Sequence, residues 1–573
     1  MRKNYLGIKL THDAAVALIA DGRLEFSIEL EKINENPRYS KCQSVEEIED
    51  ILHSERVNVD DCEIAIDGWT HGFLKVGEQG LRVAPYHDGD AISSEQHCWG
   101  WQTMPVPIML QGRGRQAYSF THVESHILGA YAMSPWSKDK LECNVLVWDG
   151  GVNPRLYSVC PRLEKNPVVC IGHLHQLYGM MYGVMGYYWG PFKDLTIFAR
   201  DPTREQLWGR RDWPGKLMAY IAYGTANADL MSELNRNYIY LVNKSERKRM
   251  PSGHYQDAVL EHQLCRSVMT NNHLRGLKDE DVLASIHEWL TLMLISGVKR
   301  NTQYGERLIF TGGSALNIKW NSALRNCEHI WELFVPPCAN DSGNAIGAAC
   351  ALASRSDQWH LEWSPYSGPK FHAGFSHVDR WTKVVCNAKA LASIIADSYL
   401  PVLCMQGRAE IGPRALGARS ILMNPAVNGA KDLLNKIKGR EYWRPVAPMV
   451  LDSQKTKWFG SGGTDDYYML FDHVAKDCTV EAAPSVVHLD GTARVQVIKD
   501  LGRGVGDTAT EGPEFLSCLL RNFMSMTGLP FMCNTSANRN GCGFFPTLYS
   551  AMNWAEEVGI KHIYADGNLY ERA

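Results

Sequence analysis

The chain has 573 residues, and at about 150 residues per domain, between two and four domains are expected. Hydrophobic residues make up 45% of it and charged residues 21%, which excludes a disordered, collagen-like or coiled-coil protein. Lysine and arginine total 59 against 63 aspartate and glutamate, so the formal charge is −4, and a general nucleic-acid or membrane-surface binder is disfavoured.

The cysteines and the N-terminus both indicate a cytoplasmic protein. Sixteen cysteines are scattered without a Cys-x-x-Cys pair, as expected of reduced, mostly buried thiols. Lys9, His12 and Asp13 interrupt the first apolar stretch, so it makes a poor signal peptide. The longest uncharged run, 176–192, is short and crowded with glycine and tyrosine, so no membrane partner is expected.

The opening of the chain predicts a β-β-β-α-β order. Apolar runs predict the strands, and Asp21-Gly22 is a hairpin turn signal between the second and third. The predicted strands are 5–9, 14–19, 24–31 and 63–66, with a helix over 45–54. This order suits an α/β fold of the actin/hexokinase (ASKHA) type.

Two later strands run directly into glycine-rich backbone. The strand predicted over 145–148 is followed by Asp149-Gly150-Gly151, and the one over 308–311 by Gly312-Gly313-Ser314. Backbone of this kind lets peptide N–H groups approach a phosphate. A tight turn is the alternative for each pair of glycines taken alone, and the recurrence of the pattern makes phosphate binding competitive with it.

The segment 354–374 is polar, aromatic and rich in proline and glycine, which is typical of a domain boundary. Beyond it the chain alternates strands and helices to the end. The sequence therefore predicts two domains, over residues 1–360 and 361–573.

A histidine pair predicts a metal site. His122 and His126 are four residues apart in a predicted helix, so both imidazoles project from one face. Two surface histidines without a metal are the alternative, and a metal needs acidic partners. Asp149 at a strand end and Asp341 at a helix start are the candidates, although Asp341 also suits a helix N-cap. Two histidines and two aspartates suit Fe²⁺ or Mn²⁺, and also admit Zn²⁺.

Cations gather between residues 406 and 444, where the local charge is +5. Arginine forks on glycine-rich backbone suit bidentate phosphate recognition. Lys431 and Lys436 are better interpreted as a solvated helix face, whereas prolines and apolar residues flank Arg444. The other candidates for anion binding here and further along the chain are Arg408, Arg414, Arg419, Lys438, Arg440 and Arg494, with amide and hydroxyl side chains at Asn534, Ser536 and Asn538.

Taken together, these strings resemble the NodU/CmcH family of carbamoyltransferases, which act on hydroxyl groups of antibiotics, sugars and nodulation factors. The resemblance covers nearly the whole chain. Its most specific motif is Gly-Arg-Ala-Glu-Ile-Gly-Pro-Arg-Ala-Leu-Gly-Ala-Arg-Ser at 407–420. The other matching strings are Thr-His-Asp at 11–13, the histidine pair, Trp-Asp-Gly at 148–150, Gly-Lys-Leu-Met-Ala at 215–219, Gly312-Gly313 through Asn317, Pro-Pro at 336–337 through Gly343, 438–445 and Asn-Thr-Ser at 534–536.

The resemblance implies an actin-like N-terminal domain, similar to tRNA threonylcarbamoyl transferases, and a YrdC-like α/β C-terminal domain. By the same resemblance His122, His126, Asp149 and Asp341 hold iron, and His12 lies beside the carbamoyl group during transfer. The catalytic Lys438 and Arg444, with Arg494 and an asparagine of 534–538, hold ATP and carbamoyl phosphate, and Mg²⁺ accompanies ATP as co-substrate. The acceptor is a hydroxylated small molecule in antibiotic or other secondary metabolism, and a homodimer is allowed.

Two departures from the family pattern concern substrate recognition. The acidic-basic run after the third strand differs, so that the family's phosphate-facing lysine is either lost or replaced by one of two residues, Arg38 or Lys41. Ala537 stands where the family usually has phenylalanine. These changes leave the chemistry intact and leave the acceptor undefined.

Three other activities compete with carbamoyl transfer. An actin-like sugar kinase needs no second basic domain, and a tRNA-modifying threonylcarbamoyl enzyme is disfavoured by the neutral charge balance. A non-catalytic nucleotide-binding scaffold needs neither a metal quartet nor a second nucleotide site.

Overall fold

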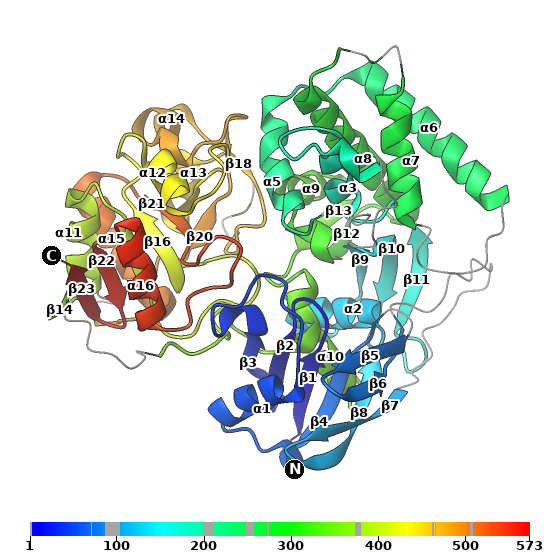
Figure 1. Ribbon diagram of the computed structural model, residues 1–573, viewed down its shortest axis with the longest axis horizontal. Helices are drawn as coiled ribbons and strands as arrows, with labels where there is room; N and C mark the ends of the chain where they lie inside the picture. Colours follow the sequence, from blue (N-terminus) through cyan, green and yellow to red (C-terminus); the bar gives the residue numbers. More distant parts are fainter. Residues whose placement is uncertain are drawn as a thin grey trace. The chain divides into compact units, whose positions relative to one another are not determined.

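The computed structural model describes residues 3–69, 72–85, 104–198, 210–247, 257–271, 274, 276–372, 380–460, 463, 466–502, 504 and 508–572 (Figure 1). The chain divides into a first unit of Met1–Tyr86, Thr103–Met133 and Asp341–Ala573, and a second unit of His87–Gln102 and Ser134–Asn340. Helices and strands alternate in both units, which confirms the predicted α/β class. The division at residues 1–360 and 361–573 stays a prediction.

The N-terminal part of the first unit is built on a six-stranded sheet of order β3-β2-β1-β4-β8-β7. Its strands are β1 (Asn4–Lys9), β2 (Ala15–Ala20), β3 (Arg23–Glu29), β4 (Cys62–Asp67), β7 (Met104–Leu110) and β8 (Arg113–Phe120). The first three are antiparallel, whereas β1, β4 and β8 run parallel. The accompanying elements are α1 (Val45–Ser54), α2 (His122–Met133), α10 (Asn344–Ser354) and the hairpin β5 (Phe73–Val76) with β6 (Gln79–Arg82).

The predicted β-β-β-α-β opening is confirmed, with one difference at the end of the third strand. Asp21 and Gly22 both have positive φ, +50° and +82°, as the predicted hairpin turn requires. The strand ends at Glu29 rather than residue 31, because Leu30–Lys32 forms a short 3₁₀ helix. Ser44 and Glu47 form a capping box that starts α1.

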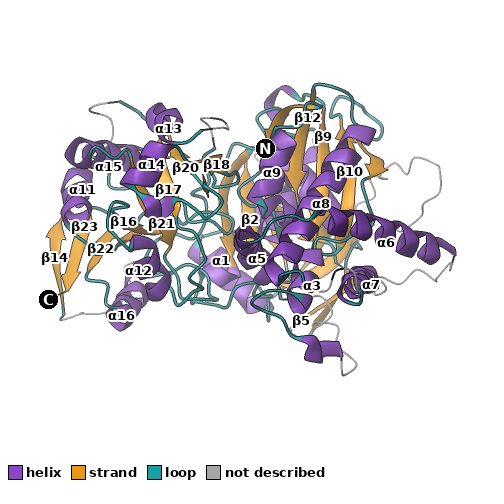
Figure 2. Ribbon diagram, turned by 90° about the horizontal axis from the view of Figure 1, so that it is seen from above, coloured by secondary structure: helices purple, strands orange, loops and turns teal. Residues whose placement is uncertain are grey.

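The C-terminal part of the first unit is built on an eight-stranded mixed sheet of order β14-β23-β22-β15-β16-β21-β17-β20. Figure 2 shows α15 and α16 on opposite sides of this sheet. The strands are β14 (Trp381–Val385), β15 (Val402–Met405), β16 (Arg419–Met423), β17 (Ala447–Leu451), β20 (Gln496–Ile498), β21 (Phe531–Ser536), β22 (His562–Ala565) and β23 (Asn568–Arg572), with a separate β18 (His473–Val474) and β19 (Thr492–Ala493) pair. The helices are α11 (Ala388–Asp397), α12 (Ala430–Ile437), α13 (Asp452–Trp458), α14 (Asp477–Ala482), α15 (Gly512–Thr527) and α16 (Leu548–Val558).

The second unit is built on a five-stranded sheet of order β11-β10-β9-β12-β13. Its strands are β9 (Cys143–Asp149), β10 (Val152–Val159), β11 (Val168–His173), β12 (Glu306–Thr311) and β13 (Ile330–Phe334), and β9 and β12 confirm the two later strands predicted from the sequence. Its helices are α3 (Met181–Tyr188), α5 (Trp213–Tyr220), α6 (Ala228–Arg247), α7 (Asp257–Met269), α8 (Asp279–Asn301) and α9 (Ile318–Arg325).

One described helix, α8, meets the length and hydropathy of a membrane span. Its apolar window is 56% buried inside the protein, and buried core helices meet the same criteria. The described cysteines are free thiols, most of them buried, as the sequence predicts.

Candidate active site

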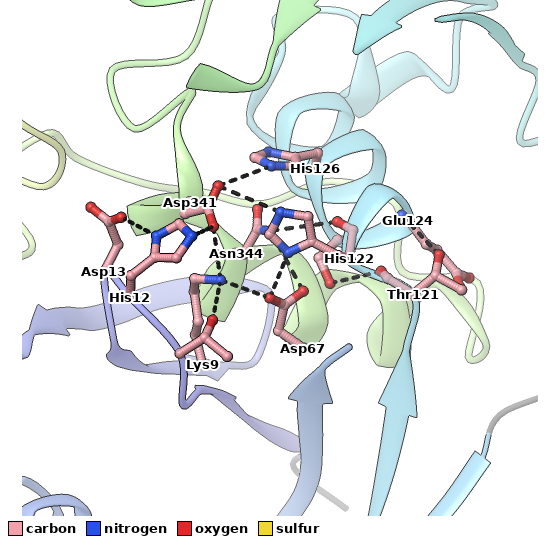
Figure 3. A network of polar contacts seen from close by, with 12 residues as sticks. Lys9, His12, Asp13, Asp67, Thr121, His122, Glu124, His126, Asp341 and Asn344 are labelled. Atoms are coloured by element: carbon pink, nitrogen blue, oxygen red, sulfur yellow. Dashed lines mark hydrogen bonds and ion pairs between the residues drawn. The ribbon is translucent and has the colours of Figure 1, made fainter. Parts of the chain in front are cut away.

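Three of the four predicted metal ligands come together in the first unit (Figure 3). His122 and His126 project from the first two turns of α2, and Asp341 begins the short turn before α10. The Nε2 atoms of both histidines lie 3.5 Å from Oδ1 of Asp341. All three side chains are buried, and their ligand atoms lie within 4.8 Å of one another.

Close packing of α10 on α2 and β1 brings these ligands together. A Cβ at Gly347 of α10 would lie 2.0 Å from the Ser125 carbonyl oxygen of α2, and one at Gly7 of β1 would lie 1.9 Å from the Ala345 carbonyl oxygen. Only glycine permits either approach. At the start of α2, Oγ1 of Thr121 accepts a hydrogen bond from the Glu124 backbone at 3.2 Å and so caps the helix.

Two charged residues beside the ligands were missed in the sequence. Lys9 ends β1, and its Nζ lies 3.0 Å from Oδ2 of both Asp67 and Asp341. Burial lowers the pKa of Lys9, but the two carboxylates outweigh burial and hold the pKa above its usual value. Because β1 and β4 are parallel neighbours, their carboxyl ends meet at one sheet edge, and this placed Lys9 and Asp67 together.

Asp67 fixes the orientation of His122. The His122 Nδ1 lies 2.9 Å from Oδ2 of Asp67 inside the protein. A proton on Nδ1 donates to this carboxylate and leaves the lone pair on Nε2, which faces Asp341. Metal-binding histidines are commonly oriented by such a carboxylate.

This donor set fits a divalent transition-metal ion. Two imidazole nitrogens and one carboxylate oxygen converge within reach of a single ion. The Nε2 of His126 is buried and has no hydrogen-bond partner within the described part of the chain. A buried ring nitrogen of this kind is costly unless it is satisfied by a ligand.

His12 lies on the other side of Asp341 from the two imidazoles. Its Nδ1 lies 2.8 Å from Oδ2 of Asp13, and its Nε2 lies 3.5 Å from Oδ2 of Asp341. The side chain is 19% exposed, in contrast to His122 and His126. A histidine that is oriented by one carboxylate and still reaches solvent suits proton transfer to a substrate.

The remaining N-terminal candidates belong to the second unit. Asp149 ends β9, and its Oδ1 accepts a hydrogen bond from the Gly313 backbone at 2.6 Å. Gly312 has φ +91°, and a Cβ there would lie 2.4 Å from the Trp148 carbonyl oxygen, so this glycine makes a tight turn. The Asn317 side chain caps α9 by accepting from the backbone of Lys319 and Trp320.

Six cationic side chains, five of them from the C-terminal part of the first unit, influence one another electrostatically. This cation cluster consists of Arg38, Arg414, Lys438, Arg440, Arg444 and Arg494. Burial, then Arg494 and Arg38, hold the pKa of Arg414 well below its usual value. Burial and Arg444 lower the pKa of Arg440 to about 9, and burial with Arg444 and Arg440 does the same for Arg494. Like charges gathered in a partly buried cluster are typical of a site that binds a polyanion.

Other predicted anion ligands are engaged by protein groups. Arg408 forms an ion pair with Glu55 at 2.6 Å, and Arg419 donates to the carbonyl oxygens of Gln406 and Gly407. The Lys438 ammonium donates to the carbonyl oxygens of Ser536 and Asn538 and to Oδ1 of Asn538. Burial, then Arg440 and Arg38, hold the pKa of Lys438 well below its usual value. These contacts favour structural support of the cluster.

Asn534 and Arg494 each have a buried polar atom without a hydrogen-bond partner among the described residues. Asn534 donates to Gln496 at 2.7 Å, but its buried Oδ1 has no hydrogen-bond partner among the described residues. The buried Nε of Arg494 also has none within that part of the chain. Both atoms are therefore available to a ligand.

The cation cluster includes one residue from the N-terminal segment. Arg38 contributes to the lowered pKa of both Arg414 and Lys438, whereas Lys41 is exposed. The backbone N–H of Arg38 donates to the Gly541 carbonyl oxygen at 2.8 Å. Of the two alternatives left open by the sequence, the geometry favours Arg38.

A buried ion pair attaches the same N-terminal segment to the 407–420 motif. The Lys32 Nζ donates to Oε1 of Glu29 at 2.8 Å and to the carbonyl oxygens of Glu410 and Gly412 at 2.6 and 2.7 Å. Oε1 of Glu29 also accepts from the Gly412 backbone at 2.7 Å. Glu29 and Lys32 thus connect β3 to the loop that carries the cation cluster.

Replacing Lys32 is expected to destabilise the protein strongly. Lys32→Met leaves the Glu29 carboxylate buried without its counter-ion and should lower the free energy of unfolding by about 3–5 kcal/mol. Urea denaturation measures this, with the exposed Lys436→Met as control. Glu29→Gln/Lys32→Met removes the uncompensated charge and should recover part of the loss. A single variant as stable as the parent would exclude this role.

Two family models match the chain. Carbamoyltransferase N-terminus matches residues 4–93 and 108–350, and Carbamoyltransferase C-terminus matches residues 392–572. The chain therefore belongs to the carbamoyltransferase family, as its motifs predict, and it is a carbamoyl-transferring enzyme.

Two relatives are similar to the chain over nearly their whole length and support this membership. Nodulation protein U of Rhizobium tropici is 37% identical over 585 residues, which cover 99% of this chain and 96% of the relative. The 3′-hydroxymethylcephem-O-carbamoyltransferase of Streptomyces clavuligerus is 30% identical over 583 residues, with 99% of each chain covered.

Among solved structures, the activator of the 2-hydroxyisocaproyl-CoA dehydratase from Clostridium difficile with bound ADPNP is 13% identical. It covers 62% of this chain and 97% of its own, at a TM-score of 0.31. A likeness this low defines no fold for the chain.

Proposed function

We propose that the protein is an ATP-dependent O-carbamoyltransferase, which moves the carbamoyl group of carbamoyl phosphate through carbamoyl-adenylate to a hydroxyl group. The observation that carries the proposal is the cation cluster. Family membership defines the transferred group, and a cluster of partly buried cations that lower one another's pKa values supports a phosphorylated donor and a nucleotide as its ligands. The name of the Streptomyces clavuligerus relative supports a hydroxyl acceptor on a small molecule.

The finer architecture is part of the same proposal. An ASKHA-type domain over residues 1–360 carries the transfer site, and a YrdC-like domain over 361–573 forms the adenylate. The order β3-β2-β1-β4-β8 of mixed strands supports the first assignment. We also propose a cytoplasmic enzyme of antibiotic or nodulation-related secondary metabolism.

The metal of the transfer site is proposed to be Fe²⁺. His122, His126 and Asp341 hold it, with Asp149 of the second unit as the fourth ligand, and this mixed nitrogen and oxygen set supports the choice. A bound divalent ion supplies Lewis-acid stabilisation for the adenylate phosphate.

The chemistry divides between the two sites. In the cation cluster, water takes the phosphoryl group of carbamoyl phosphate and releases carbamate, whose oxygen attacks the α-phosphorus of ATP and displaces pyrophosphate. Arg414, Arg444 and Arg494 neutralise the charge that accumulates on these phosphates. At the transfer site, the acceptor oxygen attacks the carbamoyl carbon, AMP leaves, and the acceptor proton passes to Nε2 of His12.

Pyrophosphate release that depends on carbamoyl phosphate tests the proposal. The protein is incubated with ATP and Mg²⁺, with and without carbamoyl phosphate, over a panel of hydroxylated metabolites and tRNA. We expect pyrophosphate only with carbamoyl phosphate, and a carbamoylated small molecule. ADP as product would indicate a kinase, tRNA as the sole acceptor a threonylcarbamoyl-type enzyme, and no turnover a scaffold.

His12→Asn is expected to slow the transfer step alone. Removing a general base typically costs about a hundredfold to ten-thousandfold in rate. Carbamoylated product should fall by about that factor, while pyrophosphate release stays near normal and carbamoyl-adenylate or its hydrolysis products accumulate. The exposed His53→Asn is the control. Equal loss in both assays would indicate a structural role for His12, and no loss would remove it from the mechanism.

A further inference from the structure

We propose that Lys9 is a positioning residue of the metal site, which occupies one oxygen of Asp341 and so makes that aspartate a one-oxygen ligand. This inference rests on the proposed metal site. Lys9 contacts Oδ2 of Asp341, whereas the two α2 histidines face Oδ1. The inference follows from the acceptors to which the Lys9 ammonium donates.

The Lys9 ammonium makes three polar contacts. Its Nζ lies 3.0 Å from Oγ1 of Thr11, 3.0 Å from Oδ2 of Asp67 and 3.0 Å from Oδ2 of Asp341. An ammonium has three protons, so these acceptors satisfy it completely. Its side chain is fully buried, and Trp69 covers it, with the ring centroid 5.1 Å from Nζ. A lysine held in this way has no freedom to reach a substrate.

The Asp341 carboxylate is divided between two sets of neighbours (Figure 3). Oδ1 lies 3.5 Å from Nε2 of His122 and 3.5 Å from Nε2 of His126. Oδ2 lies 3.0 Å from Nζ of Lys9 and 3.5 Å from Nε2 of His12. An ion shared with the two α2 histidines therefore meets Oδ1, and Oδ2 is held on the opposite side by a cation.

The same ammonium also supports His122. Asp67 accepts from Lys9 and from Nδ1 of His122 through one oxygen, Oδ2. Lys9 thus compensates the charge of the carboxylate that orients one histidine, and separately holds the carboxylate that lies between both histidines. Lys9, at the end of β1, thus positions Asp341 directly and His122 through Asp67.

A one-oxygen aspartate keeps the coordination number low. If Oδ2 were free, Asp341 could chelate the ion through both oxygens and occupy a position that a substrate phosphate needs. Catalytic metal sites retain such an open position. Lys9 therefore acts on the number of ligands around the ion, which is measurable without any carbamoyl-transfer assay.

Cobalt substitution provides the test. The full-length protein is freed of metal, loaded with Co²⁺ alone and examined by visible absorption, whose intensity falls as Co²⁺ gains ligands. In Lys9→Met, Oδ2 is released, and we expect a weaker cobalt band than in the parent. Lys9→Arg retains a cation at Oδ2 and should preserve the intensity of the parent's band.

The controls keep the outcomes distinct. Lys9→Met/Asp67→Asn removes the uncompensated buried carboxylate, and it should fold and show the same weak band if the single variant does not fold. Identical cobalt bands in the parent and both Met variants would overturn the role of Lys9. A parent that binds no Co²⁺ would instead contradict the metal site itself, and normal bands in a protein without carbamoyl transfer would contradict only the proposed function.

Discussion

His126→Ala is expected to lose its metal ion and to stop carbamoylating any acceptor, while its fold survives. The imidazole is buried, and its Nε2 has no hydrogen-bond partner among the described residues, so its removal deletes a ligand without breaking a structural bond. The variant lacks one of the two proposed imidazole ligands, which weakens metal binding. Elemental analysis of the purified variant measures the metal, and product formation measures the transfer.

Pyrophosphate release should persist in this variant, because the proposed mechanism forms the adenylate in the cation cluster. The exposed His53→Ala, on α1, controls for the loss of a histidine and should retain the metal. A His126→Ala protein with full metal content would refute the assignment of the ligands.

Arg444→Ala is expected to abolish carbamoyl-adenylate formation and to permit transfer from supplied carbamoyl-adenylate. Arg444 lowers the pKa of both Arg440 and Arg494, so it lies among the charges that are proposed to hold both phosphorylated substrates. Losing it removes transition-state stabilisation of the phosphoryl centre. Pyrophosphate release and acceptor carbamoylation are measured with each donor on one preparation.

Arg380→Ala, which removes an exposed arginine beside Glu556, is the matched control and should behave as the parent does. Equal failure of Arg444→Ala with both donors, in a protein with a normal circular dichroism spectrum, would exclude two separate sites.

Local patterns predicted much of the fold. Asp21-Gly22 predicted the hairpin of β2 and β3, and the residues around His122 and His126 predicted α2. Both elements depend on residues that are neighbours in the sequence. The end of β3 did not follow, because Leu30–Lys32 forms a 3₁₀ turn from which Lys32 pairs with Glu29 and donates to backbone carbonyl oxygens of a distant loop. The sequence also did not predict that residues 1–86 and 341–573 belong to one unit, because this depends on contacts between residues far apart in the sequence.

The candidate site was likewise predicted only in part from the sequence. Spacing identified His122 and His126, but Lys9 and Asp67 needed the parallel pairing of β1 with β4. Composition identified the arginines between 406 and 444 as a group. The sequence did not distinguish Arg419, whose guanidinium donates to carbonyl oxygens, from Arg494 further along the chain, whose buried Nε has no hydrogen-bond partner among the described residues. That distinction depends on tertiary packing.

The most direct test of the proposed reaction is isolation of its intermediate. The protein is incubated with ATP, Mg²⁺ and ¹³C-labelled carbamoyl phosphate without an acceptor, and the quenched mixture is analysed by mass spectrometry. We predict ¹³C-labelled carbamoyl-adenylate that requires both substrates, disappears when an acceptor is added and is absent from Arg444→Ala. Carbamoylated acceptor formed at full rate without ATP would contradict the proposal.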